Sequence, residues 1–349
     1  MRHRSFALVT AATALLAVPL TAAASGSATS PTQVRVLVVK ATWGPQPFTD
    51  AQVDAVMQGV VRFYGTASFG KVALSYTQTP WLDGMPGPMS CADEGAQLPQ
   101  LAASAGWNPA AYDRVVYLIP YGGGNACAIS AFQGAGFGTL MNTDVLPVGA
   151  VIHELGHSFG MGHAGLLTCW YEGTRRLCSA DMYGDTADVM GGTGGSNVLA
   201  YVGDFGGLQK ARAGWIAPTY ITKPGTYRLA PVELASALPQ ALVIRGSVYA
   251  YWIDLRKPVG NDAHLGDPAI TGFAVHRIAE DAFAPGADPL MPDYLVPNAH
   301  SSSYYTPPGA TFTLPGEFTL TALSRNHAGV ITIRYRKRDG RDRSPAYVP

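Results

Sequence analysis

The hydrophobic positions in the first part of the chain follow two different periods, which together predict strands alternating with helices. Residues 34–40 are almost all apolar or β-branched, as expected for a buried strand. In residues 50–64 the apolar positions recur every three or four residues, which predicts a helix with Thr49 or Asp50 as its N-cap. A strand, a helix and a strand in this order predict a right-handed crossover and an α/β sheet. The further strands expected here are residues 71–77 and 114–119.

The pattern changes at about residue 222 to short β-like runs that are broken by Pro and Gly, which is typical of an all-β sandwich. We therefore place a boundary at residues 218–224. It separates an α/β domain over residues 33–220 from a β-sandwich-like domain over residues 221–338 and a tail over residues 339–349. The runs expected as strands are 225–229, 242–244, 248–255, 272–277, 311–314, 318–320 and 330–335.

The first residues predict export from the cell. Arg2 and Arg4 precede an apolar run over residues 6–20, and three alanines at 22–24 supply a small-residue cleavage site. This is the layout of a secretory signal peptide, which we assign to residues 1–24, followed by a polar linker over residues 25–32. The apolar run is shorter than the roughly 20 residues that a membrane-spanning helix needs, and no later run is longer. We expect a secreted protein without a membrane span.

The composition excludes several classes of protein. Hydrophobic residues make up 47% of the chain and charged residues 14%, so a chain disordered by charge is excluded. Lys plus Arg and Asp plus Glu both number 24, so no basic excess points to nucleic acid. We therefore expect no nucleic-acid partner.

Four cysteines in an exported chain predict two disulfides, and four cysteines allow three pairings. We favour Cys169 with Cys178, because this pair closes a short local loop, and this choice leaves Cys91 with Cys127. A metal site built from cysteines is the alternative, but the chain has no C-x-x-C pair.

Residues 153–163 carry the clearest chemistry in the sequence. His153 and His157 are four residues apart, so on a helix they share one face and can bind one ion. Glu154 stands where its carboxylate can reach a water on that ion. Gly160 can take a positive φ and end the helix, so that His163 approaches as a third ligand. Three protein ligands leave one position open, which predicts a catalytic Zn²⁺ site rather than a structural one. The alternative is a core helix whose histidines only make structural hydrogen bonds. Such a helix would not need three of the chain's eight histidines within eleven residues.

The H-E-x-x-H-x-x-G-x-x-H pattern resembles the metzincin clan of zinc endopeptidases. That clan has a methionine turn beneath the metal, and Met190 within Asp-Val-Met-Gly-Gly is similar to it. The wider pattern resembles the gametolysin-like peptidases among the metzincins. The segments that carry this second resemblance are residues 183–191, 210–216 and 251–256, with Gly260 and Asp262.

The resemblance implies a metzincin-type α/β (α+β) catalytic domain with a twisted mixed sheet and an active-site helix. It also implies a secreted zinc-dependent endopeptidase in which Glu154 is the general base. We accordingly expect a monomer whose partner is a protein or peptide substrate. Some metzincins carry a tyrosine two residues after the turn methionine, but here that residue is Gly192, and Tyr183 is only a weak substitute. We expect residues 132–142 to form an edge strand or a loop that pairs with the substrate. Val198 and Leu199 are the expected wall of the pocket beyond the scissile bond.

Several other interpretations stay open. A narrow peptidase for glycopeptides or cell-wall peptides keeps the same chemistry, and a zinc-retaining surface-binding or adhesion protein gives the function to the β domain. Ca²⁺ could bind the carboxylates near the methionine turn, although turn hydrogen bonds are the favoured interpretation. Aromatic side chains of the β domain could bind carbohydrate, although a buried face is favoured. The residues concerned are Asp181, Asp185 and Asp188 for calcium, and Tyr249, Tyr251 and Trp252 for carbohydrate. The remaining histidines, interpreted as structural or surface residues, are His264, His276, His300 and His327.

Overall fold

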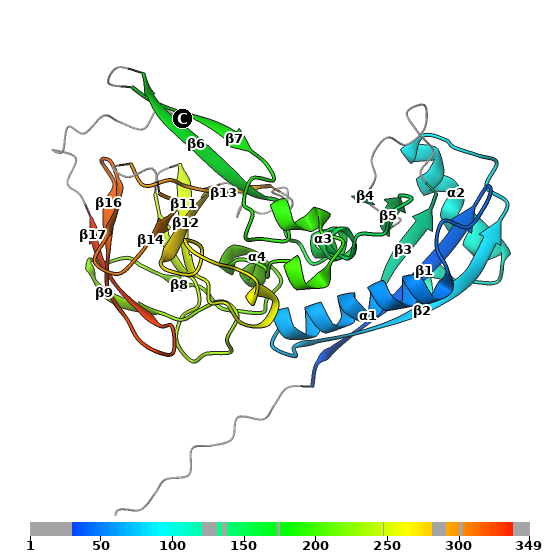
Figure 1. Ribbon diagram of the computed structural model, residues 1–349, viewed down its shortest axis with the longest axis horizontal. Helices are drawn as coiled ribbons and strands as arrows, with labels where there is room; N and C mark the ends of the chain where they lie inside the picture. Colours follow the sequence, from blue (N-terminus) through cyan, green and yellow to red (C-terminus); the bar gives the residue numbers. More distant parts are fainter. Residues whose placement is uncertain are drawn as a thin grey trace, which may run out of the picture. The chain divides into compact units, whose positions relative to one another are not determined.

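A five-stranded sheet comes first along the chain in the computed structural model, and two further sheets follow it (Figure 1). The structure describes residues 30–120, 131–134, 138–172, 175–246, 248–280, 291–299 and 303–337. This part of the chain is mixed α/β, with few helices and more strand than helix. The predicted signal peptide, Cys127, His300 and the tail over residues 339–349 lie outside the described residues.

The five-stranded sheet has the order β2-β1-β3-β5-β4, and only β4 runs antiparallel to its neighbour. Alternate residues of β1 enter two apolar cores, one on each face of the sheet. Burial on both faces explains why this strand appears in the sequence as an unbroken apolar run. The strands are β1 (Thr32–Thr42), β2 (Val72–Asp83), β3 (Arg114–Ile119), β4 (Ala131–Gly134) and β5 (Gly138–Asn142).

Helices cover both faces of this sheet. Helix α1 (Asp50–Ala67) begins at the N-cap Thr49, one of the two residues predicted for this position, and Thr49 forms a capping box with Gln52. It joins β1 to the parallel strand β2, so the predicted crossover connection between strands of one sheet is confirmed. Helix α2 (Cys91–Ser104) packs on the opposite face. Helix α3 (Val148–Ser158) follows β5 and packs beside α1, where the Tyr64 hydroxyl donates a hydrogen bond to the Ile152 carbonyl (2.8 Å).

The second sheet has eight strands, and it crosses the boundary that we expect near residue 220. A hairpin of β6 (Ala164–Glu172) and β7 (Arg175–Asp181) continues into strands of the C-terminal part. Its disulfide joins Cys169 and Cys178, which face each other across the two strands, so the first predicted pairing is confirmed. The order is β7-β6-β13-β12-β11-β10-β8, with β14 beside β12. These further strands are β8 (Thr219–Tyr220), β10 (Leu242–Arg245), β11 (Tyr249–Leu255), β12 (Phe273–Ala279), β13 (Asp293–Leu295) and β14 (Tyr305–Thr306).

The third sheet packs against the second through one shared apolar core that includes Ile253, Phe312 and Ile333. Within residues 221–337, here called the C-terminal β region, the described residues form strands and no α-helix, so the predicted all-β character is confirmed. The third sheet has the order β15-β16-β17-β9. Its strands are β9 (Gly225–Leu229), β15 (Thr311–Leu314), β16 (Phe318–Arg325) and β17 (Ile331–Lys337).

Helix α3 and the short helix α4 (Gly207–Arg212) lie between the five-stranded sheet and the two C-terminal sheets (Figure 1). Among the helices described, none has both the length and the apolar character that crossing a membrane requires. Cys91 at the start of α2 is also disulfide-bonded, and Cys127, its expected partner, is not among the described residues.

Candidate metal centre

Helix α3 carries His153, Glu154 and His157 on a segment that is almost entirely buried. The helix ends one residue after His157, and Gly160 takes a left-handed backbone conformation with φ +82°. A glycine adopts this conformation without the strain that a side chain would add. The chain thereby turns back toward the helix, as the sequence predicts, and brings His163 to the same place.

The structure brings the three predicted metal ligands together. One ring nitrogen from each of His153, His157 and His163 lies within 4.8 Å of those of the other two. The ring centroids are 4.8 Å apart for the His153–His157 and His157–His163 pairs, and 5.3 Å apart for His153 and His163. No other group of three or more potential ligand side chains is found within the described ranges.

Backbone carbonyls fix the orientation of two of these rings. The Nδ1 atom of His153 lies 2.8 Å from the Val189 carbonyl oxygen, and that of His157 lies 2.8 Å from the Met161 carbonyl oxygen. A carbonyl only accepts hydrogen bonds, so in each neutral ring the proton is on Nδ1. The lone pair of each Nε2 is then free to bind a metal, which is the usual second-sphere arrangement of a metal-binding histidine.

The surroundings also hold these rings in the neutral form that binds metals. Burial, followed by the charge of His157, lowers the pKa of His153 to about 3. Burial and the charge of His157 lower the pKa of His163 to about 4, and burial lowers that of His157 as well. A neutral imidazole keeps the lone pair that a metal ion needs, whereas a protonated ring has lost it. Three neutral imidazoles fit zinc, although their chemistry alone does not exclude other transition metals.

Met190 lies buried beneath α3. A Cβ atom added to Gly156 would stand 2.7 Å from the Met190 sulfur, so the glycine in the middle of the motif makes room for this side chain. A Cβ added to Gly194 would likewise stand 2.9 Å from Nδ1 of His153. The glycine-rich segment that follows Met190 therefore passes directly over the His153 ring. The sequence shows this run of glycines, but it does not show that the Val189 carbonyl orients His153.

Glu154 and Tyr183 line the same cavity as His153. The cavity has a volume of about 320 Å³, and glycines form its opposite wall. The ring of Tyr183 lies 4.4 Å from that of His163, and burial and the charge of Glu154 raise the pKa of its hydroxyl. Tyr183 thus belongs to the site, whereas its sequence position favours it only weakly. The residues lining the cavity are Ala150, His153, Glu154, Tyr183, Gly191, Gly192, Gly194 and Gly195.

The carboxylates near Met190 have other partners. Asp181 accepts a hydrogen bond from the Tyr183 backbone N–H, and Asp185 accepts one from that of Ala187. Asp188 accepts from the backbone N–H groups of Met190 and Gly206 and pairs with Arg256. These turn and cap interactions agree with the interpretation favoured over calcium. Asp188 is part of a larger group of buried charges, the buried ionic cluster, which consists of Asp188, Asp204, Lys210, Arg256 and Asp262.

The aromatic and histidine side chains of the C-terminal β region are mostly structural. Tyr251 and Trp252 are 2% and 3% exposed, so neither offers a face on which a sugar could stack. His276 is buried, His327 is exposed, and the His264 ring contacts the Asn261 carbonyl oxygen.

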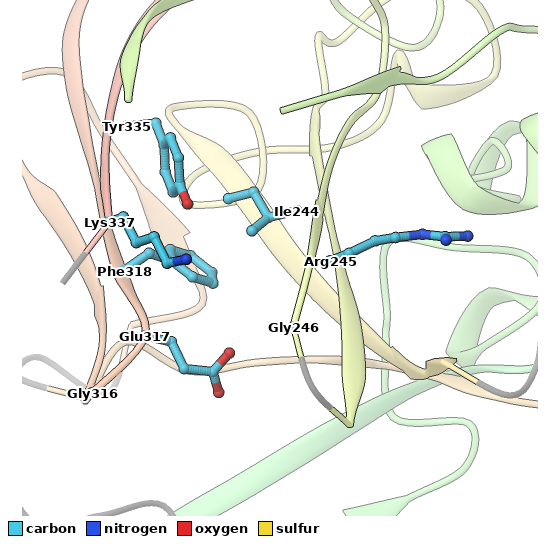
Figure 2. Close-up of a pocket in the computed structure, with 8 residues that line it drawn as sticks. All are labelled: Ile244, Arg245, Gly246, Gly316, Glu317, Phe318, Tyr335 and Lys337. Carbon is cyan, nitrogen blue, oxygen red and sulfur yellow. The ribbon is translucent and has the colours of Figure 1, made fainter. Parts of the chain in front are cut away.

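A second cavity of about 330 Å³ opens between the two C-terminal sheets (Figure 2). The charged ends of Glu317 and Lys337 turn toward the same space, while Arg245 points away from it. Glu317 already accepts a hydrogen bond from the Tyr251 hydroxyl (3.0 Å). This cavity has one carboxylate and no histidine, so it lacks the ligand set of the metal centre.

No known protein-family model matches the chain, and no curated protein sequence matches it either.

Proposed function

We propose that this chain is a secreted zinc-dependent endopeptidase, a gametolysin-like metzincin that hydrolyses peptide bonds of extracellular proteins. One observation carries the proposal: three imidazoles converge on one point, and the first of them, His153, shares a cavity with Glu154. A structural metal site would use a fourth protein ligand, and the described residues supply only three.

When bound, zinc supplies a lowered pKa for a coordinated water and polarises a carbonyl oxygen. Glu154 takes the proton of the attacking water and then gives it to the leaving amine, so one carboxylate serves as base and as acid. The Tyr183 ring lies 4.4 Å from that of His163 and lines the cavity, so we assign its hydroxyl as the hydrogen-bond donor to the oxygen of the scissile carbonyl. Gly192 has no side chain to fill that role.

The edge of the five-stranded sheet is where an extended substrate would pair. Strand β4 lies at one of the two edges of the sheet and packs beside α3, so a peptide added beside it would run along the helix that carries His153 and His157. Of the two expected wall residues, Val198 is half exposed, whereas Leu199 packs toward Gly59 of α1. Val198 is therefore the better candidate for contact with a substrate side chain beyond the scissile bond.

Cleavage of an unfolded protein tests the proposal. The secreted chain would be incubated with reduced and alkylated casein, with peptidoglycan and with a folded glycoprotein, and the products read by mass spectrometry. We expect cleavage of casein that a zinc chelator abolishes and added Zn²⁺ restores. Cleavage of peptidoglycan or glycoprotein alone would show the narrow peptidase instead. No cleavage by a chain that holds one zinc would contradict the proposal and favour a binding protein.

A further inference from the structure

The third histidine lies where the chain passes into the eight-stranded sheet. His163 directly precedes β6, and β6 pairs in parallel with β13 of the C-terminal β region. The backbone N–H of Asp293, the first residue of β13, donates a hydrogen bond to the His163 carbonyl oxygen (3.0 Å). The main chain of this ligand is thus held by a strand that lies 130 residues further along the chain.

A buried glutamine makes a second tie to the same segment. The Gly162 backbone N–H donates to Oε1 of Gln209 on helix α4 (3.0 Å), and Nε2 of Gln209 donates to Oδ1 of Asp293 (3.1 Å). Both side chains are almost fully buried, with Gln209 1% and Asp293 3% exposed. The oxygen of the Gln209 amide therefore accepts a hydrogen bond from the segment that carries His163, and its nitrogen donates one to β13.

His276 and Asp254 extend this chain of contacts into the C-terminal sheet. The Nδ1 atom of His276 lies 3.2 Å from Oδ2 of Asp293, and its Nε2 lies 3.5 Å from Oδ1 of Asp254. Oδ2 of Asp254 accepts a hydrogen bond from the backbone N–H of Gly207, in the first turn of α4 (2.7 Å). Burial by itself would lower the pKa of His276, but the carboxylates of Asp254 and Asp293 raise it well above the ordinary value. We name these four residues, Gln209, Asp293, His276 and Asp254, the buried relay.

We infer that the buried relay positions His163 for metal binding, so that the C-terminal β region completes the metal centre. The inference rests on the metal centre of the proposed function. Gln209, Asp293, His276 and Asp254 are positioning residues, because they act through the segment that carries His163.

The need for such support follows from the local chain. His163 is the only one of the three ligands outside α3, and Gly160, three residues before it, has the left-handed conformation. A short segment with glycines at 160 and 162 has many accessible conformations when nothing holds it. Partners that orient a ligand from outside the first coordination sphere typically contribute 10–100-fold to metal affinity.

Zinc affinity, measured by competition with a chromophoric chelator, tests the inference. Gln209→Leu should raise the zinc Kd about 10–100-fold, because it removes the group that holds Gly162. The matched control is Gln240→Leu, since Gln240 is also buried but donates only to the carbonyls of Pro231, Val232 and Leu234. This control should lower the free energy of unfolding without changing the zinc Kd. Asp293→Asn, which keeps the backbone bond to His163, is the second variant if Gln209→Leu does not fold, and it should raise the Kd in the same direction.

The visible absorption of the cobalt-substituted protein gives an independent readout. It should change in Gln209→Leu and stay as in the wild type in Gln240→Leu, because it reports the geometry of the ligands. An unchanged zinc Kd in Gln209→Leu, or an equal rise in Gln240→Leu, would overturn the inference. A wild-type chain that binds zinc but cleaves nothing would contradict only the proposed function. A wild-type chain that binds no zinc would overturn both.

Discussion

The metal centre and the buried relay contain the same side chain in opposite states. His153, His157 and His163 lie against one another, two of them also against backbone carbonyls, and their pKa values are lowered from 6.5. His276 lies between the carboxylates of Asp254 and Asp293, and its pKa is raised well above 6.5. Burial lowers the pKa of every one of these rings and is the main cause in the metal centre, whereas at His276 the two carboxylates outweigh it. A neutral ring suits a metal ligand, and a charged ring suits an ionic support.

The two regions should therefore respond to pH in opposite directions. Below pH 6.5 the metal-centre histidines bind protons in the unfolded chain but stay neutral in the folded state. The free energy of unfolding of the metal-free protein therefore falls as the pH falls. His276 does the reverse, because the folded state holds its proton more tightly than the unfolded chain does. Its contribution is complete below pH 6.5 and is lost as the pH rises toward its raised pKa.

The largest effect on stability should come from removing the central cation of the buried ionic cluster. Arg256 pairs with Asp262 at 2.7 Å and with Asp188 at 3.2 Å, and all three side chains are buried. Arg256→Met leaves two carboxylates without their cation, and breaking a buried pair in this way lowers the free energy of unfolding by about 3–5 kcal/mol. Urea unfolding monitored by circular dichroism measures the loss.

Arg245→Met is the matched control for Arg256→Met. The Arg245 side chain is 59% exposed and pairs with Glu280 at 3.7 Å, so the free energy of unfolding should change by at most about 1 kcal/mol. An equal decrease in the free energy of unfolding of the two variants would contradict this prediction. It would show that charge pairing in the buried ionic cluster stabilises the fold no more than pairing at the surface.

A smaller effect should appear in the pH dependence of His276→Gln. Wild type should lose its stability advantage over this variant as the pH rises above 6.5, by up to about 1.4 kcal/mol per pH unit. The two proteins share the metal-centre histidines, so the contribution of those rings cancels in the difference. The measurement is urea unfolding of both metal-free proteins between pH 5 and pH 9, a range chosen to bracket the ordinary histidine pKa. A difference that stays constant across this range would contradict a charged His276.

The sequence predicts the elements whose signals are local. Helix α1 has its own cap and apolar period, and strands β9 and β15 have the same limits as the runs predicted from the sequence. The metal ligands are predictable for the same reason, because a helix and one glycine turn bring all three histidines together within eleven residues.

The contacts that support this site depend on residues far apart in the chain. The pairing of β6 with β13 joins residues 164–166 to 293–295, and nothing in either segment specifies the other. Gln209 and His276 likewise belong to no sequence motif. Their roles depend on the residues that they contact, and those residues lie far away in the sequence. Tyr183 lies beside His163 because strands β6 and β7 are paired as a hairpin, so the end of β7 lies next to the start of β6. The hairpin itself is missing from the predicted strands, because its outer residues, such as Trp170, are exposed and the alternation is weak.

The most direct test of the metal centre as a peptidase site is the Glu154→Gln variant, measured for zinc content and casein cleavage on one sample. We expect one zinc per chain, as in the wild type, and a cleavage rate lower by about 10²–10⁴-fold, because the proton-transfer group is gone. Glu317→Gln, which changes the carboxylate of the cavity between the two C-terminal sheets, should leave both values unchanged. A Glu154→Gln variant that cleaves at the wild-type rate, or that loses its zinc together with its activity, would contradict the assignment of Glu154 as the general base.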